Sequence, residues 1–506
     1  MIGIKVRCYK EITRFKIQNP VSVRWNSTNS PALKTLEEMP GLSKLPVIGA
    51  LHHFLPVVGS IGHIENFFNL YGHFHKKYGS FVKMEGILSR PPMVIMFEPE
   101  HYDQVYRVEE ENPLRPGFDT IVYYREVLQK STFDGVYGLT TAQGEKWRDF
   151  RTKVNPALLK LKLLKVYAPG IEEIATEFVE RLKKTKEDPV YLQNHFYDEM
   201  SKYALEAVGF VGLGARLGTL SEDLTEDHPA RRLQTSVKDI FDLAIRIEAR
   251  PKFMKHLPTA PYRKILAACD TQWEISSMYI EQARNTIKNR GYEIPEEDKS
   301  IIEKLLAIDE KVAVMMANEM LLAGIDTVSF VTVGLLYHLA TNPQAQDRVR
   351  EEVQSTGTSR RYLKACLKES LRIWPVIPAN LRRTTKEHVV GGYLLPKGVE
   401  VIAPNEFLSK QEKYYTRPLE FIPERWLADK SDPLYYGNAH PMVTLPFGFG
   451  VRSCIGRRIA ELEIEILTSA IVDNFVVSWH GPPIKVKTTI MNLFQKPYNF
   501  KFESVK

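Results

Sequence analysis

The stretch FGFGVRSCIG, from Phe447 to Gly456, sets one cysteine among three glycines, just before a long amphipathic segment. Because the pattern IGRRIAELEIEILTSAIVDNF that follows has helical spacing, Cys454 is expected beside a helix N-terminus. The partial positive charge and free N–H groups of such a terminus lower the pKa of a thiol. The glycines would also admit a flat ligand close to the loop. The stretch therefore predicts a thiolate metal ligand, with a small buried cysteine at a tight turn as the simpler alternative.

The other cysteines and the overall composition exclude several classes of protein. Cys8, Cys269 and Cys366 form no C-x-x-C pair and no regular spacing, which argues against a disulfide framework or a zinc cluster and favours a reducing compartment. The 506-residue chain is 44% hydrophobic and 25% charged, as globular proteins are. Its net charge of +7 includes no lysine or arginine run of the kind that binds nucleic acid, so no nucleic-acid partner is expected.

Residues 1–30 have a composition of their own. They contain six lysines and arginines against one acid, Glu11, and their apolar residues form no continuous run. A basic, acid-poor and weakly amphipathic segment with a Ser/Asn/Thr tail is typical of a mitochondrial targeting presequence rather than of a secretory signal or a membrane anchor. We therefore expect a presequence over residues 1–30, with a disordered basic tail as the alternative.

The pattern of the rest of the chain is mainly helical. Segments 81–85 and 93–97 alternate or are β-branched and predict a hairpin, and helical spacing dominates from Trp147 to about Arg350. A second pair of strands is expected around Gly391 and Gly392, and more strands from Val476 onward. Scattered strands in a helical chain do not build a parallel α/β sheet. We expect one large, mainly α domain with small β-sheets.

The segment MLLAGIDTVSFVTVGLLY, Met320 to Tyr337, is long and apolar enough to span a membrane. Asp326 lies in its middle, where a bilayer would make a lone acid costly, so a long internal helix of a soluble protein is the better prediction. Gly324 suggests a close approach by another group, since glycine is unfavourable inside a helix. Asp326 and Thr327 could relay protons beside that gap, or the segment could simply pack, with Thr327 bonded to a backbone carbonyl.

Two further pairs have spacings that put both side chains on one helix face. Glu369 and Arg372 are three residues apart and could form an ion pair, for which a structural role is the default. Trp147 and Arg151 are four residues apart and would present an indole N–H and a guanidinium to an anionic ligand group, or form an ordinary interface patch.

Taken together, these residues resemble the cytochrome P-450 family. AGIDT, ESLR, PERW (Pro423 to Trp426) and the Trp147/Arg151 pair are similar to family motifs and occur in the family's order. Each short motif occurs by chance, but five in order do not. The resemblance covers residues 36–506 and implies the P-450 fold in a single large domain. In the cysteine stretch, the residues that match the haem-binding signature are Phe447, Gly450, Arg452, Cys454 and Gly456.

The resemblance implies a role for each motif. The cofactor would be haem b (iron protoporphyrin IX), with Cys454 as the proximal thiolate ligand that favours O–O cleavage. Phe447 would pack against the cysteine loop, and Asp326 and Thr327 would be the catalytic acid–alcohol pair. The side chains that hold the haem propionates would be Trp147, Arg151, Arg382 and Arg452. The structural triad would be Glu369, Arg372 and Arg425.

The motifs also resemble the mitochondrial class of the family. The presequence-like start, HPMVTLPFGFG and CIGRRIAELE match that class, and segment 115–130 looks most like insect members. Lys364 and Lys368 match the basic pair that docks an acidic ferredoxin, and their spacing of four puts both ammonium groups on one face. The resemblance implies a monooxygenase that inserts one atom of O₂ into a lipophilic small molecule. Electrons would come from a mitochondrial ferredoxin and its NADPH-dependent reductase, on the matrix side, with peripheral attachment to the inner membrane.

One departure leaves alternatives open. Between Glu352 and Tyr362 the chain has only VQSTGTSRR, a connection over 353–361 that is shorter than family members usually carry. A haem protein or shortened isoform that no longer turns over is therefore the alternative function, and a peroxide-rearranging isomerase is disfavoured by the intact acid–alcohol pair. The residues expected to line an apolar substrate pocket are Phe330, Val331, Val376 and Ile377.

Overall fold

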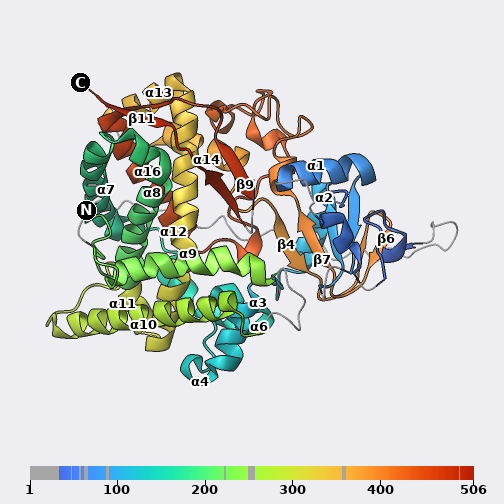
Figure 1. Ribbon diagram of the computed structural model, residues 1–506, viewed down its shortest axis with the longest axis horizontal. Helices are drawn as coiled ribbons and strands as arrows, with labels where there is room; N and C mark the ends of the chain where they lie inside the picture. The colour runs from blue at the N-terminus through green and yellow to red at the C-terminus, as the bar shows by residue number, and fades with distance from the viewer. Residues whose placement is uncertain are drawn as a thin grey trace, which may run out of the picture.

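The central apolar segment forms α12 (Glu310–Thr341), which runs through the helical part of this computed structural model (Figure 1). Asp309 caps its start by accepting the N–H groups of Lys311 and Val312. Among the described residues, α12 is the one helix long and apolar enough to cross a membrane, and 67% of its apolar window is buried inside the protein. The prediction of an internal helix is therefore confirmed.

The structure describes residues 33–46, 48–55, 59–61, 66–86, 90–221, 224–248, 257–355, 360–488 and 491–505, without the side chains of residues 245 and 246. The expected presequence, residues 1–30, lies outside the described residues. So do residues 356–359 of the short connection.

Long helices surround α12, as the helical spacing predicts. Helices α8, α10, α14 and α16 contact it directly, and α7 packs against α8 and α16. These and the other long helices are α6 (Gly144–Leu158), α7 (Leu163–Thr185), α8 (Pro189–Leu213), α9 (Pro229–Glu248), α10 (Ala260–Asn289), α13 (Pro343–Gln354), α14 (Arg361–Ile373) and α16 (Arg457–Asn474). Shorter helices and turns are α3 (Asp119–Tyr123), the π-helical η3 (Tyr124–Leu128), α4 (Lys130–Phe133), α5 (Gly138–Thr141), α11 (Ile301–Leu306), η5 (Pro423–Trp426), η6 (Tyr436–Asn438) and η7 (Gly450–Arg452).

The strands form small sheets, and the largest lies to one side of the helices (Figure 1). The predicted hairpin is β2 (Phe81–Met84) paired antiparallel with β3 (Met93–Met96); β7 (Glu400–Ala403) joins β3 in parallel, and β4 (Asn380–Arg383) completes the order β2-β3-β7-β4. The strands expected near Gly391 are β5 (His388–Val390) and β6 (Tyr393–Leu395), with β1 (Lys34–Thr35) beside β6. At the C-terminus β8 (Phe475–Trp479) pairs with β11 (Phe500–Ser504), and β9 (Lys485–Thr488) with β10 (Asn492–Gln495).

The buried apolar side chains form two cores. One fills the space among the helices around α12. The other lies between the four-stranded sheet and α1 (Phe67–Tyr78), α2 (Pro99–Val108) and α15 (Asn405–Leu408). Phe447 packs against the first core and Phe449 against the second. The cysteine stretch therefore lies where the two cores meet.

Candidate functional site at the cysteine loop

Cys454 sits in a tight loop between η7 and α16. Its N–H donates to the Phe447 carbonyl at 2.9 Å, and the Ser453 N–H donates to the Gly450 carbonyl at 3.0 Å. Gly448 and Gly450 have φ of 75° and 62°, a region that side-chain-bearing residues seldom adopt. The backbone N–H groups of Gly456 and Arg457, at the start of α16, hydrogen-bond the Cys454 sulfur. The predicted position beside a helix N-terminus is confirmed.

The surroundings of Cys454 differ from those of the other described cysteines. Cys269 and Cys366 are buried, whereas Cys454 is exposed. Burial among protein atoms nevertheless raises the pKa of the Cys454 thiol, while the two N–H groups and the charges of Arg151 and Arg115 oppose that rise. The Cys454 side chain is thus accessible although protein atoms surround it, whereas a closely packed side chain would be buried. The alternative of a closely packed small hydrophobe is therefore wrong.

Four guanidinium groups share this region with the sulfur. Burial lowers the pKa of Arg452 to about 8, and repulsion from Arg115, Arg382 and Arg151 contributes to the shift. Burial also lowers the pKa of Arg115, of Arg151 and of Arg382, and a Cys454 thiolate would act in the opposite direction on Arg115 and Arg151. Repulsion from Arg452 links all four charges, and Arg115 and Arg151 also act on Cys454. We call Arg115, Arg151, Arg382 and Arg452 the arginine cluster.

The acceptors of the arginine cluster are mostly neutral. Arg452 donates to the carbonyls of Pro113, Leu139 and Ala142 at 3.0–3.3 Å. The buried Arg382 donates to the carbonyls of Leu381 and Phe449, and its Nε has no partner among the described residues. Buried cations are normally paired with anions. The donor set therefore fits a metal cofactor that carries carboxylates and takes a thiolate ligand.

Trp147 joins the cluster through its ring. Arg452 lies over the indole at 3.9 Å and Arg151 at 5.9 Å from the ring centroid, and all three side chains are buried. Arg151 also donates to the Ser453 carbonyl at 3.0 Å, which ties α6 to the cysteine loop. The predicted shared face of Trp147 and Arg151 is present, and it faces the loop that bears Cys454.

The acid and alcohol on α12 lie in a desolvated turn. Burial raises the pKa of Asp326 to about 6, with further repulsion from Asp242 and an opposing effect of Lys238. The Thr327 hydroxyl donates to the Ala323 carbonyl at 2.6 Å. Ala323 is exposed although most of α12 is buried, so the Thr327 hydroxyl lies on an accessible side of the helix.

The reason for glycine at position 324 is helix packing. A Cβ added to Gly324 would lie 2.8 Å from Cγ2 of Val208 on α8, closer than side chains approach one another. At Gly324 the close approach is therefore made by a neighbouring helix, and the packing alternative holds there.

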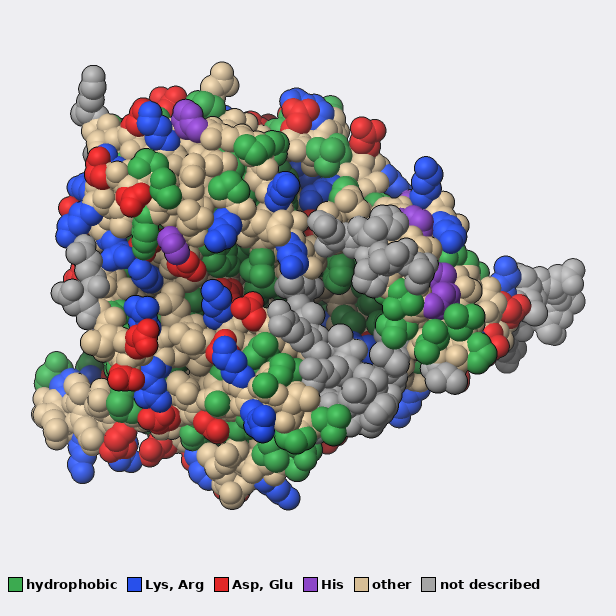
Figure 2. Space-filling model, in the orientation of Figure 1, with side chains coloured by type: hydrophobic (Ala, Val, Ile, Leu, Met, Phe, Trp, Pro, Cys, Tyr) green, Lys and Arg blue, Asp and Glu red, His purple; other side chains and the backbone are tan. Residues whose placement is uncertain are grey.

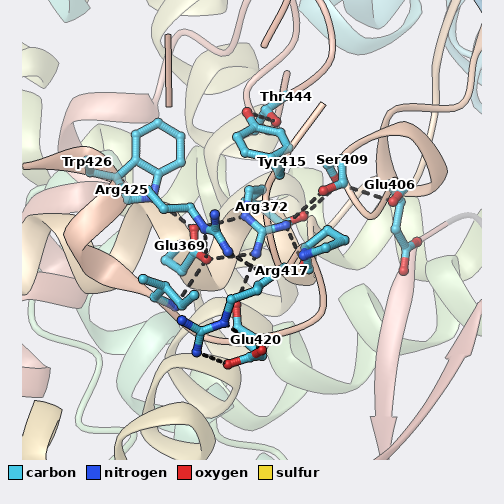
Figure 3. Close-up of polar contacts among 12 residues, drawn as sticks. Glu369, Arg372, Glu406, Ser409, Tyr415, Arg417, Glu420, Arg425, Trp426 and Thr444 are labelled. Atoms are coloured by element: carbon cyan, nitrogen blue, oxygen red, sulfur yellow. Dashed lines mark hydrogen bonds and ion pairs between the residues drawn. The ribbon is translucent and has the colours of Figure 1, made fainter. Parts of the chain in front are cut away.

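Glu369, Arg372 and Arg425 form one buried cluster with no exposed surface (Figure 3). Arg372 donates to both oxygens of Glu369 at 2.9 and 2.7 Å, and Arg425 donates to one at 3.0 Å. The Trp426 indole N–H adds a bond to Glu369 at 3.0 Å, and Arg372 reaches the carbonyls of Ser409 and Pro418. The three predicted triad residues are therefore in contact and join α14 to the 409–426 segment.

The two lysines of α14 are exposed on the same face of the helix. Lys364 pairs with Glu465 at 3.6 Å, and Lys368 lies 5.7 Å from the ring of Trp426. Because Trp426 bonds Glu369, this face lies directly outside the triad.

Of the four residues expected to line a substrate pocket, three are buried and one is exposed. Phe330 has no exposed surface and stacks on Phe494 with ring centroids 4.4 Å apart, so it belongs to the core. Val331 and Val376 are buried, and Ile377 is 40% exposed. Figure 2 shows this face hollowed at its centre, between the helical side and the sheet side, with hydrophobic side chains inside the hollow.

The comparisons with known proteins identify the family of the chain. The family model for cytochrome P450 matches residues 50–503. The chain is 35% identical to cytochrome P450 CYP12A2 of Musca domestica, over 96% of this chain and 94% of that protein. It is 35% identical to probable cytochrome P450 12b2, mitochondrial, of Drosophila melanogaster, over 93% and 90%. It is 30% identical to probable cytochrome P450 12e1, mitochondrial, of the same fly, over 99% of both.

The chain therefore belongs to the cytochrome P450 family. It is a haem-iron monooxygenase, an oxidoreductase, and the resemblance of its motifs to insect mitochondrial members is confirmed. Neither comparison supports the alternative of a haem protein that does not turn over.

Proposed function

We propose that Cys454 is the thiolate that would ligate the iron of haem b and that the arginine cluster, with Trp147, would bind the haem propionates. The observation that carries this proposal is the convergence of four guanidinium groups and one accessible thiol in a desolvated region whose acceptors are mostly neutral carbonyls. Phe447 supports the loop by accepting the Cys454 N–H. When bound, the haem supplies the oxygen activation on which the family's reaction depends.

Asp326 and Thr327 are proposed to supply protons. A carboxyl with a pKa of about 6 can take up and release a proton near neutral pH. The bond from Thr327 to the Ala323 carbonyl fixes the hydroxyl on the exposed side of α12. The charged groups that act on Asp326 are Asp242 and Lys238 of α9 and Asp198 of α8, and they are candidates to exchange protons with it.

Glu369, Arg372 and Arg425 are proposed to be structural. Their side chains have no exposed surface and use their hydrogen bonds on one another and on backbone carbonyls. Nη1 of Arg425 is buried without a hydrogen-bond partner among the described residues, but the other contacts bind the three side chains to one another and to the backbone. A fully buried network of this kind holds segments together rather than binding a substrate.

The electron donor is proposed to be a mitochondrial ferredoxin with its NADPH-dependent reductase, docking on Lys364 and Lys368. Both ammonium groups are exposed, and an acidic partner would be steered to such a face. Relatives of this chain are named as mitochondrial. We therefore place the enzyme in mitochondria, peripheral to the inner membrane on the matrix side, with residues 1–30 as presequence and 36–506 as the catalytic domain.

The substrate is proposed to be a lipophilic small molecule. The hydrophobic side chains inside the central hollow would bind an apolar ligand and exclude water (Figure 2).

The reduced carbon-monoxide spectrum tests the ligand assignment. We expect the purified chain to show the far red-shifted Soret band of a haem thiolate and Cys454→Ala to lose it, because alanine cannot ligate iron. Cys269→Ala, at a buried cysteine on α10, is the control and should keep the band. A Cys454→Ala protein with the band intact would contradict the assignment. Haem reduction by a ferredoxin, its reductase and NADPH then tests the electron donor separately.

A further inference from the structure

Glu110 connects the cysteine loop to α2. It follows Glu109, the buried C-cap residue of α2. Glu109 accepts hydrogen bonds from the N–H of Thr385 at 2.9 Å and from the Thr385 hydroxyl at 2.7 Å, and its carboxylate lies 2.6 Å from Nε2 of His388. These contacts fix the chain at Glu109 against the segment that leads into β5. The backbone from which the Glu110 side chain extends is therefore held in place.

The Glu110 side chain caps the turn that precedes Cys454. Its Oε2 accepts the N–H of Val451 at 2.8 Å. Val451 lies in the first turn of η7, where N–H groups have no partner within the helix. A carboxylate from another segment thus satisfies this donor, as an N-cap side chain would. The capped turn carries Arg452 and leads directly to Cys454.

Gly450 leaves the space that the Glu110 carboxylate occupies. Its φ is +62°, and a Cβ added there would lie 1.9 Å from the Oε2 atom of Glu110. The glycine pattern of the cysteine stretch suggests clearance for a flat ligand, but at Gly450 the cleared space is taken by Glu110. Any side chain at position 450 would displace the carboxylate from Val451.

The charge of Glu110 also acts on the arginine cluster. Burial lowers the pKa of Arg382, and Glu110 is the carboxylate that opposes this shift. The second oxygen of Glu110, Oε1, is buried and has no hydrogen-bond partner among the described residues. No hydrogen-bond donor among the described residues therefore contacts this oxygen, and the negative charge of Glu110 acts on Arg382 of the arginine cluster.

We propose that Glu110 is a positioning residue for the haem site: it holds the turn at Gly450–Arg452 so that Arg452 and Cys454 face the cofactor. This inference rests on the proposed function, since it takes Cys454 as the iron ligand. Glu110 itself contacts Val451 and not the reacting atoms.

The test compares Glu110→Ala with Glu111→Ala in the full-length haem protein. The Glu111 side chain is 82% exposed and is the matched control on the same segment. For Glu110→Ala we expect amide hydrogen exchange in 450–454 and haem transfer to apomyoglobin to be faster by about tenfold, the effect of losing one good cap. The thiolate Soret band should weaken, while Glu111→Ala behaves as wild type.

Gly450→Ala gives an independent arm. It should reproduce the Glu110→Ala phenotype, and in the Glu110→Ala background it should add less than it does alone because the carboxylate is already gone. Exchange, haem transfer and Soret band all unchanged in Glu110→Ala would overturn the inference while leaving the proposed function intact. A wild-type protein without the thiolate band would overturn the proposed function, and the exchange rates at 450–454 would still decide whether Glu110 holds the turn.

Discussion

At the scale of single residues, the site depends on arginine side chains whose positive charge is disfavoured by burial. The arginine cluster keeps four cations together, and its members face carbonyls more than carboxylates. Arg115 belongs to it although it lies in a loop without a motif. It opens segment 115–130, which as a whole indicated only the subfamily. Neither Arg115 nor Glu110 could be predicted, because a loop residue gains its role from tertiary placement that no periodicity encodes.

Glu463 on α16 provides a residue-scale prediction about stability and pH. Its carboxyl is buried, Oε1 has no partner among the described residues, and burial raises its pKa from 4.5 to about 8. The folded state keeps a proton that the unfolded state releases, so stability falls as pH rises from about 4.5 to about 8. Near pH 8 we expect the free energy of unfolding of Glu463→Gln, measured in urea, to exceed that of the wild type by about 2–4 kcal/mol.

At or below pH 4.5 the same substitution should change the free energy of unfolding little, because Glu463 is then largely protonated in both the folded and the unfolded state. Glu461→Gln is the control on α16, because that carboxylate pairs with Arg457 at 2.9 Å and is partly exposed. A Glu463→Gln protein whose stability gain is the same at both pH values would contradict the burial argument.

At the scale of elements, the strongest patterns were predicted correctly. The hairpin β2–β3, the internal helix α12 and the start of α16 after Cys454 all follow from periodicity and turn residues. The reason for an individual glycine did not follow. Both the helix glycine Gly324 and the loop glycine Gly450 indicate that another group comes close, yet one admits Val208 of a neighbouring helix and the other a carboxylate. Sequence shows that space is needed, and only the packed structure shows what takes it.

The contact between α12 and α8 can be tested at Gly324. Gly324→Ala places a Cβ 2.8 Å from Val208, so we expect overpacking to lower the free energy of unfolding by about 1–3 kcal/mol despite alanine's better helix propensity. Gly72→Ala on α1 is the control, because its Cβ would make an ordinary contact at 3.5 Å with Phe407, and it should be neutral or stabilising. Adding Val208→Ala to Gly324→Ala should recover part of the loss. Equal effects of the two glycine substitutions would rule out the packing explanation.

At the scale of the whole molecule, the cysteine stretch joins the helical core to the sheet core. Cys454 meets α16 on one side, while Glu110 and Arg382 come from the sheet side on the other. The triad lies beneath the exposed face of α14, as Lys368 contacts Trp426 and Trp426 bonds Glu369. A partner that docks on α14 therefore binds a face whose geometry is fixed from within.

Charge reversal on α14 tests that docking face. Lys364 is 55% exposed, but its partner Glu465 at 3.6 Å is only 13% exposed, so the thiolate Soret band of the variant is checked first to show that it has folded. We expect Lys364→Glu with Lys368→Glu to slow haem reduction by a mitochondrial ferredoxin about tenfold or more at low salt, and less at high salt, because steering is electrostatic. The control is Lys485→Glu with Lys487→Glu, an exposed pair on β9 that changes the net charge equally. If both pairs slow reduction alike, net charge alone is responsible and α14 is not the docking face; if neither does, the proposed partner site is wrong.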